Sequence, residues 1–167
     1  ERIGAGPQIQ MSSYLIETLR SKFPADVLEA HAFRGDETVT IRKEALAAAA
    51  AFLRDELGFD FLMDLTAADY APRAPRFELV CHLYSSRHNY RLRLKCPVEG
   101  ENPAVASLTP LWDSANWFER EAYDMFGIKF EGHPDLRRIL MYDGFEGHPL
   151  RKDYPLKKRQ PRIPHRD

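Results

Sequence analysis

Cysteine is scarce in this sequence of 167 residues, which contains only Cys81 and Cys96. Two cysteines cannot build a cysteine-only iron–sulfur or zinc site, because such a site takes four sulfur ligands. If the two residues lie on paired strands, they point to the same face about four residues apart. At ~3.3 Å per residue this separation is too long for a disulfide. We therefore expect two reduced, packed thiols, as in a cytosolic protein.

Motifs for metals, nucleotides and serine nucleophiles are also missing. None of the histidines forms a His-x3-His or His-x-Cys grouping. The sequence contains neither G-x-G-x-x-G nor G-x-x-x-x-G-K-[ST], the loops that bind dinucleotides and phosphates. It also lacks the G-x-S-x-G turn of many hydrolases. We therefore expect no bound metal, NADH, flavin or ATP, and no complete active site on this chain.

Long apolar runs are absent as well. From Glu17 onward, the longest uncharged runs are Ala45–Leu53 and Asn102–Trp112, and both are far shorter than the ~20 residues of a membrane-spanning helix. No run has the charged start and apolar centre of a secretory signal. Met11 could be a natural start, and we expect residues 1–11 to form a flexible N-terminal extension.

Charge is present but unevenly spread. From Arg151 to Asp167 the chain carries seven Lys and Arg against two Asp, which gives this tail a net charge of +5. The whole chain has a net charge of −1, so the remainder carries −6. A basic tail on an acidic body indicates a charged partner, which could be nucleic acid, anionic lipid or an acidic protein. The tail is rich in proline and poor in aromatics, which favours a disordered or partner-wrapped extension.

Apolar periodicity predicts an α+β fold. The helical spacing of Leu15, Leu19 and Phe23 indicates a helix, and the strict alternation in Asn89–Cys96 indicates a strand with one wet and one buried face. The element order α-β-β-α-β-β-β predicts a two-layer sandwich of helices on a mixed five-stranded sheet. The predicted elements are helix 12–23, strands 27–33 and 38–41, helix 42–58, and strands 59–66, 76–84 and 89–96.

A further helix follows the sheet. Asp113 or Ser114 can cap its start, it runs to about Phe126, and Gly127 can supply its left-handed end. We place the α+β domain at residues 12–128. Beyond it, Gly, Pro and aromatics recur every few residues, so little regular structure is expected. We therefore expect residues 129–167 to be an extended, irregular interaction segment that exchanges amide hydrogens quickly in the isolated chain.

The stretch "NWFEREAYDMFGIKF", residues 116–130, holds the densest chemistry. Arg120 and Asp124 are four residues apart on the helix and close enough to pair. Glu119 and Glu121 are two apart and point away from each other, which opposes a hydrolase with paired carboxylates. One interpretation is a helix whose acids face solvent and Arg120. Another is a protein interface, where aromatics, arginine and acids are typical.

Two ordered blocks resemble a known family. The pattern Glu-Arg-Glu-x2-Asp, then Gly-Ile, then His-Pro-x-Leu-Arg-Arg-Ile-Leu stands in "EREAYDMFGIKFEGHPDLRRIL", and "GHPLRKDYPL" follows it. Together with the upstream "DLTAADY", these blocks resemble the 30 kDa-subunit family, which supplies the C subunit of respiratory NADH:quinone oxidoreductase (complex I). The resemblance covers roughly residues 14–156.

The resemblance implies a subunit of the peripheral arm that carries no redox centre. Electron transfer from NADH to quinone, coupled to proton translocation, would belong to the whole complex, with FMN, iron–sulfur clusters and quinone on partner subunits. The implied partners are foremost the D subunit, then the B subunit, near the quinone pocket, with no nucleic acid and only indirect membrane contact. The implied location is the cytoplasmic side of the cell membrane, or the matrix side in mitochondria. The residues expected at the partner interface are Trp117, Glu119, Arg120, Glu121, Asp124, His133, Arg137, Arg138, His148, Arg151, Lys152 and Asp153.

Alternatives remain open at this point. Membrane-bound hydrogenases, formate hydrogenlyases and the photosynthetic NDH complex have similar subunits with the same structural task. A separate nucleic-acid-binding domain would use the basic tail and show steeply salt-dependent binding. A solitary hydrolase would need Glu119 and Glu121 to converge on one pocket.

Overall fold

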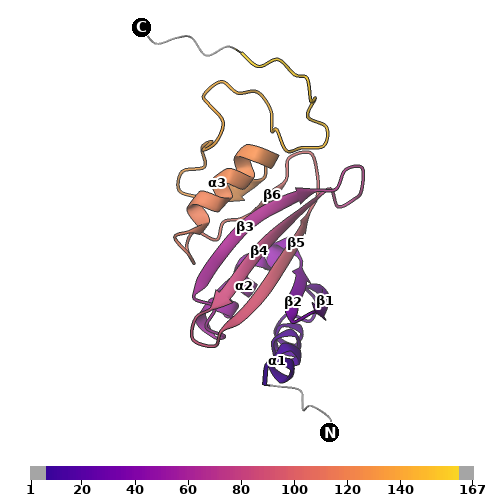
Figure 1. Ribbon diagram of the computed structural model, residues 1–167, viewed down its shortest axis with the longest axis vertical. Helices are drawn as coiled ribbons and strands as arrows, with labels where there is room; N and C mark the ends of the chain where they lie inside the picture. Colours follow the sequence, from indigo (N-terminus) through magenta and orange to yellow (C-terminus); the bar gives the residue numbers. More distant parts are fainter. Residues whose placement is uncertain (1–6, 162–167) are drawn as a thin grey trace.

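The computed structural model describes the backbone of residues 7–161 and the side chains of residues 14–161. Its element order matches the predicted α-β-β-α-β-β-β arrangement, with a third helix after the sheet (Figure 1). The α+β class is therefore confirmed. The elements are α1 (Pro7–Lys22), β1 (Val27–Phe33), β2 (Asp36–Ile41), η1 (Lys43–Ala45), α2 (Leu46–Asp55), β3 (Phe61–Asp69), β4 (Phe77–Ser85), β5 (Tyr90–Val98), β6 (Ala104–Ala106), α3 (Ala115–Phe126) and β7 (Lys129–Glu131).

The N-terminal helix differs from the predicted one in its start. It begins at Pro7 rather than Ser12, so part of the expected flexible extension is helical. Residues 1–6 of that extension, and residues 162–167 of the basic tail, lie outside the described residues. Leu15 and Leu19 of α1 are buried in the core, as their helical spacing requires.

The five long strands form one mixed sheet in the order β1-β2-β5-β4-β3. β2 and β5 are parallel, and the other neighbouring strands are antiparallel. After β2 the chain crosses through α2 to the far edge, and β3, β4 and β5 then return as a meander to pair with β2. The predicted mixed five-stranded sheet is thus confirmed.

One face of the sheet is covered by helices and holds the core. Phe77, Leu79, Cys81 and Leu83 of β4 alternate with half-buried residues, as the sequence pattern predicted. The alanine-rich helix α2 lies behind the sheet in Figure 1, where its small side chains allow close approach to the strands. The opposite face, turned toward the viewer, is covered by no helix of the described chain.

The two cysteines lie on the face of the sheet that the helices cover. Both are buried and free. The offset predicted between them was wrong: Cys81 is opposite Leu94 and Cys96 is opposite Leu79, so the thiols occupy diagonal positions two residues apart. Burial raises the pKa of the Cys96 thiol to about 12, which keeps it protonated and unreactive at neutral pH.

The segment after β5 contributes more to the core than its composition indicated. Strands β6 and β7 pair in parallel, which places Lys129–Glu131 in a short sheet where no strand was predicted. Trp112 is buried and donates its indole N–H to the Phe59 carbonyl at 3.2 Å. After Glu131 the described chain contains no helix or strand, which agrees with the predicted irregular segment.

None of the helices in the described part of the chain is long and apolar enough to cross a bilayer.

Candidate functional site

The candidate site is built around α3 and the segment from His133 to Pro161, which we call the strap. Ala115, Ala122 and Met125 of α3 are buried on one face, and α3 lies beside β3. The helix ends at Gly127, whose φ of +76° gives the predicted left-handed cap. The predicted side-chain cap at the start was wrong, because Ser114 donates its hydroxyl to the Leu62 carbonyl at 3.1 Å instead.

Glu119 is fully buried on the inner side of α3. Its carboxylate accepts hydrogen bonds from the Ser107 hydroxyl at 2.7 Å and the Leu108 amide at 2.6 Å. Burial raises the pKa of Glu119 to about 7, and these two hydrogen bonds oppose that rise. The interpretation that the acids of this helix face solvent is wrong for Glu119, which fastens α3 to the loop after β6.

Asp124 is also fully buried, and it organises the strap. One carboxylate oxygen accepts the amides of Ile139, Leu140 and Met141 at 3.1, 2.8 and 2.9 Å. The other oxygen pairs with Arg138 at 2.7 Å. Burial tends to raise the pKa of Asp124, but the three amides and the guanidinium outweigh it and lower that pKa below its ordinary value.

Arg120 does not pair with Asp124, so the helical pair predicted from their spacing was wrong. Its guanidinium donates instead to the carbonyls of Arg137 and Arg138, at 3.1 and 3.3 Å. It also lies over the ring of Trp117, 5.3 Å from the centroid. Arg120 and Asp124 therefore hold the same part of the strap from two positions on α3.

The "GHPLR" motif of the strap caps the end of α3. The last carbonyls of a helix have no partner within the helix. Here the Asp124 carbonyl accepts a hydrogen bond from the His148 ring at 3.0 Å. The Met125 carbonyl accepts one from the Leu150 amide at 3.1 Å, and the Phe126 carbonyl accepts one from the Arg151 guanidinium at 2.5 Å. Burial lowers the pKa of His148.

Close packing at this end of α3 requires a glycine. A Cβ placed on Gly127 would lie 2.6 Å from the His148 ring and 2.7 Å from the Arg151 guanidinium. The positive φ and the contact with the strap therefore select glycine for two separate reasons.

The other His-Pro turn binds the opposite end of the same helix. His133 donates its Nε2–H to the Asn116 carbonyl at 3.2 Å, and its Nδ1 accepts the Asp135 amide at 3.0 Å. Both His-Pro imidazoles therefore bind backbone carbonyls of α3. Their α3 partners lie far away in the sequence, however, which turn chemistry alone could not indicate.

A further attachment joins the strap to the hairpin between β3 and β4. Asp69, buried at the end of β3, accepts two bonds from Arg76 at 3.1 and 2.8 Å and the Lys152 amide at 2.8 Å. Arg76 also pairs with Asp153 at 2.8 Å. Burial tends to raise the pKa of Asp69, but its hydrogen bonds outweigh this and lower the pKa to about 2. Sequence reasoning did not identify Asp69, Arg76 or Ser107, because no local pattern marks the partner of a distant segment.

The twelve predicted interface residues therefore divide by exposure. Glu119 and Asp124 are buried and fully engaged within the chain. The half-buried members Arg120, His133, Arg138, His148 and Arg151 bind backbone or side chains of α3 and the strap. Those with exposed side chains are Trp117, Glu121, Arg137, Lys152 and Asp153.

The acids of α3 do not form a paired-carboxylate site. Glu119 and Glu121 do not converge: the first is buried and the second is exposed, as their spacing predicted. Within residues 7–161 no group of three or more His, Cys, Asp or Glu could hold a metal ion. The carboxylates of Glu119 and Asp124 are occupied by donors of the chain itself, so they hold segments together.

Comparisons with known proteins agree on one family. Residues 39–160 match the family described as the respiratory-chain NADH dehydrogenase 30 Kd subunit. The C subunit of NADH-quinone oxidoreductase from Geotalea uraniireducens is 50% identical over 138 residues, which are 83% of this chain and 84% of that protein. The protein of the same name from Roseiflexus sp. is 52% identical over 144 residues, covering 85% and 83%.

Solved structures show the same fold. A trypsin-resistant fragment (1–134) of Nqo5 is 35% identical, with a TM-score of 0.65, and the match covers 74% of this chain and 98% of the fragment. A chain of the membrane-bound sulfane sulfur reductase, an archaeal respiratory membrane complex, has a TM-score of 0.77 at 20% identity, covering 88% and 87%. The second likeness supports the fold alone.

Proposed function

The chain belongs to the family of the 30 kDa subunit of respiratory-chain NADH dehydrogenase, and from this membership we propose its function. It is a structural subunit in the peripheral arm of NADH:quinone oxidoreductase, on the cytoplasmic side of the membrane. FMN, the iron–sulfur clusters and quinone are held by other subunits. Its two cysteines are both buried, which leaves it without accessible thiolate ligands.

The finding that carries this proposal beyond family membership is the construction of α3 and the strap. Hydrogen bonds at both ends of α3 join it to an irregular segment, and we propose that they hold the surface of this segment in a fixed path before any partner binds. A pre-ordered surface loses less conformational entropy on association. We propose that this surface packs against the D subunit of the complex, near the quinone site.

Trp117 is the centre of the proposed contact. It is 60% exposed, and Arg120 fixes one side of its ring. Exposed tryptophan held beside arginine is the composition of binding hot spots. Glu121 and Arg137 are exposed nearby on α3 and the strap and supply charged groups around the ring.

A tagged copy of the full chain, purified from native membranes, tests the proposal. We expect an approximately stoichiometric set of flavin, iron–sulfur and membrane subunits in mass spectrometry. Trp117→Ala should reduce that recovery about tenfold, the effect of a hot-spot side chain. Tyr14→Ala, which removes an aromatic that is 51% exposed on α1, is the matched control and should not.

Other outcomes have defined meanings. A wild-type chain that purifies alone, or with nucleic acid, contradicts the proposed function. Recovery of hydrogenase subunits in place of the NADH-oxidising ones would assign the chain to a related membrane complex. Cross-links from position 117 to any subunit except the D subunit would refute the proposed contact while leaving membership of the complex intact.

A further inference from the structure

The face of the sheet that no helix within residues 7–161 covers carries two rows of polar residues. Asp64, His82 and Arg93 lie directly opposite one another on β3, β4 and β5, with Thr38 of β2 next to Arg93. In the adjacent row Arg91 lies opposite Tyr84. We call this region, turned toward the viewer in Figure 1, the open face.

The arginines of the open face lack acidic partners. Among the described residues no carboxylate pairs with Arg91 or Arg93. Arg93 donates to the Thr38 hydroxyl at 3.2 Å, and Arg91 lies over the Tyr84 ring at 5.2 Å. Each guanidinium has five N–H donors, so most of their donors remain free.

The other end of the same face is different. There Lys95 pairs with Glu78 at 2.9 Å, and both side chains are largely covered. An antiparallel sheet commonly leaves one polar face in water, so polarity alone indicates nothing. The contrast between a neutralised end and an end with two unpaired arginines is what singles out the rows around Arg91 and Arg93.

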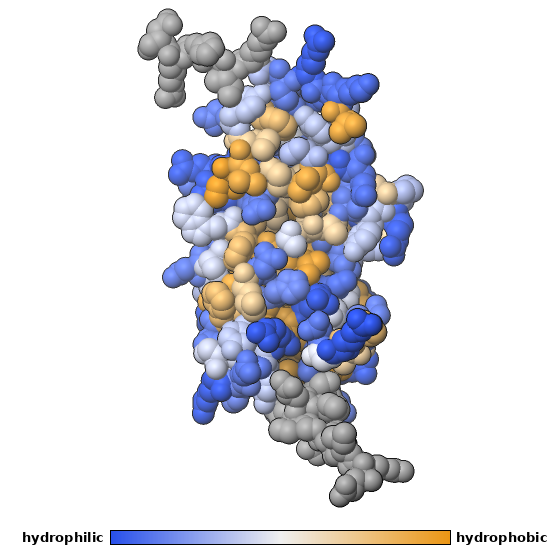
Figure 2. Space-filling view, in the orientation of Figure 1, coloured by the Kyte–Doolittle hydropathy of each residue, from blue (hydrophilic) through white to orange (hydrophobic). Residues whose placement is uncertain are grey.

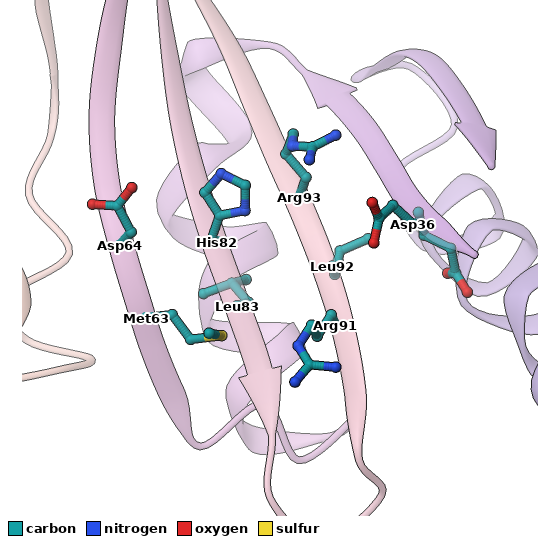
Figure 3. A pocket seen from close by; sticks show the side chains of 9 residues that line it. Asp36, Met63, Asp64, His82, Leu83, Arg91, Leu92 and Arg93 are labelled. Carbon is teal, nitrogen blue, oxygen red and sulfur yellow. The ribbon is translucent and has the colours of Figure 1, made fainter. Parts of the chain in front are cut away.

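This end of the face is also hollowed and partly apolar. A shallow pocket of about 260 Å³ lies there, and Figure 3 shows His82 and Arg93 side by side within it, with Asp64 and Asp36 on either side. The register of β3 shifts at Met63, which lines the same pocket and is 40% exposed. Such a bulge redirects a side chain and is common beside binding sites.

Apolar surface borders the arginines. Phe61, opposite Tyr84 on the edge strand β3, is 51% exposed. Figure 2 shows apolar patches among the charged side chains on this side of the molecule. Exposed aromatic and methionine side chains beside unpaired arginines match the composition of protein interfaces.

We infer that the open face around Arg91 and Arg93 docks an acidic segment of a partner subunit. A carboxylate of that segment binds the two guanidinium groups, and its apolar side chains cover Phe61 and Met63. Asp36, Glu37 and Asp64 line the same pocket, so an extended anion such as a nucleic acid backbone or an anionic membrane would lie against these acids. A single protein carboxylate can instead lie at the two guanidinium groups, with its apolar neighbours over Phe61 and Met63. This inference rests on the proposed function but uses a surface separate from Trp117.

Charge reversal tests the inference in the tagged full chain. We expect Arg91→Glu combined with Arg93→Glu to lower recovery of the partner subunits at least tenfold. Arg87→Glu, an exposed arginine in the turn between β4 and β5, is the matched control and should leave recovery unchanged. The thermal unfolding of each purified chain shows whether a loss comes from misfolding. The neutral pair Arg91→Gln and Arg93→Gln serves if the double glutamate variant does not fold.

A photo-crosslinking residue at position 63 then identifies the occupant. We expect cross-links to a partner segment that contains Asp or Glu, and an Asp→Arg or Glu→Arg change in that segment should restore recovery of the charge-reversed chain. Cross-links only to nucleic acid, to lipid or to a second copy of the chain overturn the inference, as does normal recovery of a folded charge-reversed variant. If the wild-type chain recovers no subunits, the proposed function fails instead, and the two failures are distinguishable.

Discussion

The Asp124 carboxylate lies 2.7 Å from the Arg138 guanidinium and is completely buried beneath the strap. Because Asp124 also binds three consecutive backbone amides, it acts as the centre around which residues 138–141 turn. The carbonyl of the same residue receives the ring N–H of His148. One residue of α3 therefore fixes two separate parts of an otherwise irregular segment.

Asp124→Asn should release this part of the strap. The variant removes the charge that pairs with Arg138 and leaves the guanidinium half-buried without a carboxylate. Breaking a buried pair by removing one partner costs about 3 kcal/mol in the free energy of unfolding. Hydrogen exchange should show the amides of Ile139, Leu140 and Met141 protected in the wild type and exposed in the variant.

The matched control is Asp135→Asn, because Asp135 pairs with Arg137 at the surface. Surface pairs contribute about 0 to 1 kcal/mol, so little change is expected. The same exchange experiment tests the expectation that the whole segment beyond Lys129 exchanges quickly. From the structure we expect instead that the amides bound to Asp124 and Asp69 exchange slowly even in the isolated chain.

Gly127→Ala should detach the "GHPLR" motif from α3. Gly127 and Gly132 both have positive φ, of +76° and +85°. A Cβ at Gly132 would meet no atom within 4 Å. Alanine there should lower the free energy of unfolding only by the strain of its left-handed backbone, about 1 kcal/mol. Alanine at Gly127 also collides with His148 and Arg151, adding about 2 kcal/mol. Chemical unfolding measures the free energy of unfolding of the two variants. Equal destabilisation would show that His148 and Arg151 move away from position 127 without loss of stability.

Glu119→Gln should flatten the pH dependence of stability. The pKa of Glu119 is raised from 4.5 to about 7, so the folded chain holds this proton more tightly than the unfolded chain. The contribution of this proton to the free energy of unfolding is complete below pH 4.5 and is lost as the pH rises through 7. The free energy of unfolding changes by about 3 kcal/mol over this range. Thermal unfolding at about pH 5 and about pH 8 should therefore differ more in the wild type than in the variant.

Two residues complete that experiment. Glu37, whose pKa burial also raises to about 7, contributes with the same sign in both proteins and cancels in the comparison. Glu121→Gln changes an exposed carboxylate on the same helix and should leave the pH dependence as in the wild type. A Glu119 variant with unchanged pH dependence would show that this carboxylate titrates normally.

Asp69→Asn should weaken the attachment of the strap to the β3–β4 hairpin. The pKa of Asp69 is lowered from 3.8 to about 2. The ionised carboxylate therefore adds about 2 kcal/mol to the free energy of unfolding above about pH 4, and this stabilisation is lost as the pH falls through 2. The variant should be less stable than the wild type at about pH 7 and should approach it near pH 2. Asp143→Asn, at an exposed carboxylate, is the control.

Sequence reasoning was accurate for the alternation of the strands, the apolar face of α3 and its glycine end. The alternation in β4 and β5 follows from the two-residue period of a strand, and the apolar face of α3 from the helical period. Gly127 could be recognised as a helix end because only glycine adopts positive φ without strain. These features depend on neighbours within a few residues, which the sequence displays directly.

The tertiary structure alone decided where the charges of α3 go. The sequence spacing paired Arg120 with Asp124, but Asp124 binds Arg138 and Arg120 binds strap carbonyls. Glu119 is buried because Ser107 and the Leu108 amide reach it from the loop after β6. Such partners come from distant parts of the chain, and a buried charge is retained only where the assembled fold supplies them. The sequence determined the elements and the family, whereas the packed fold determined which acids became internal anchors.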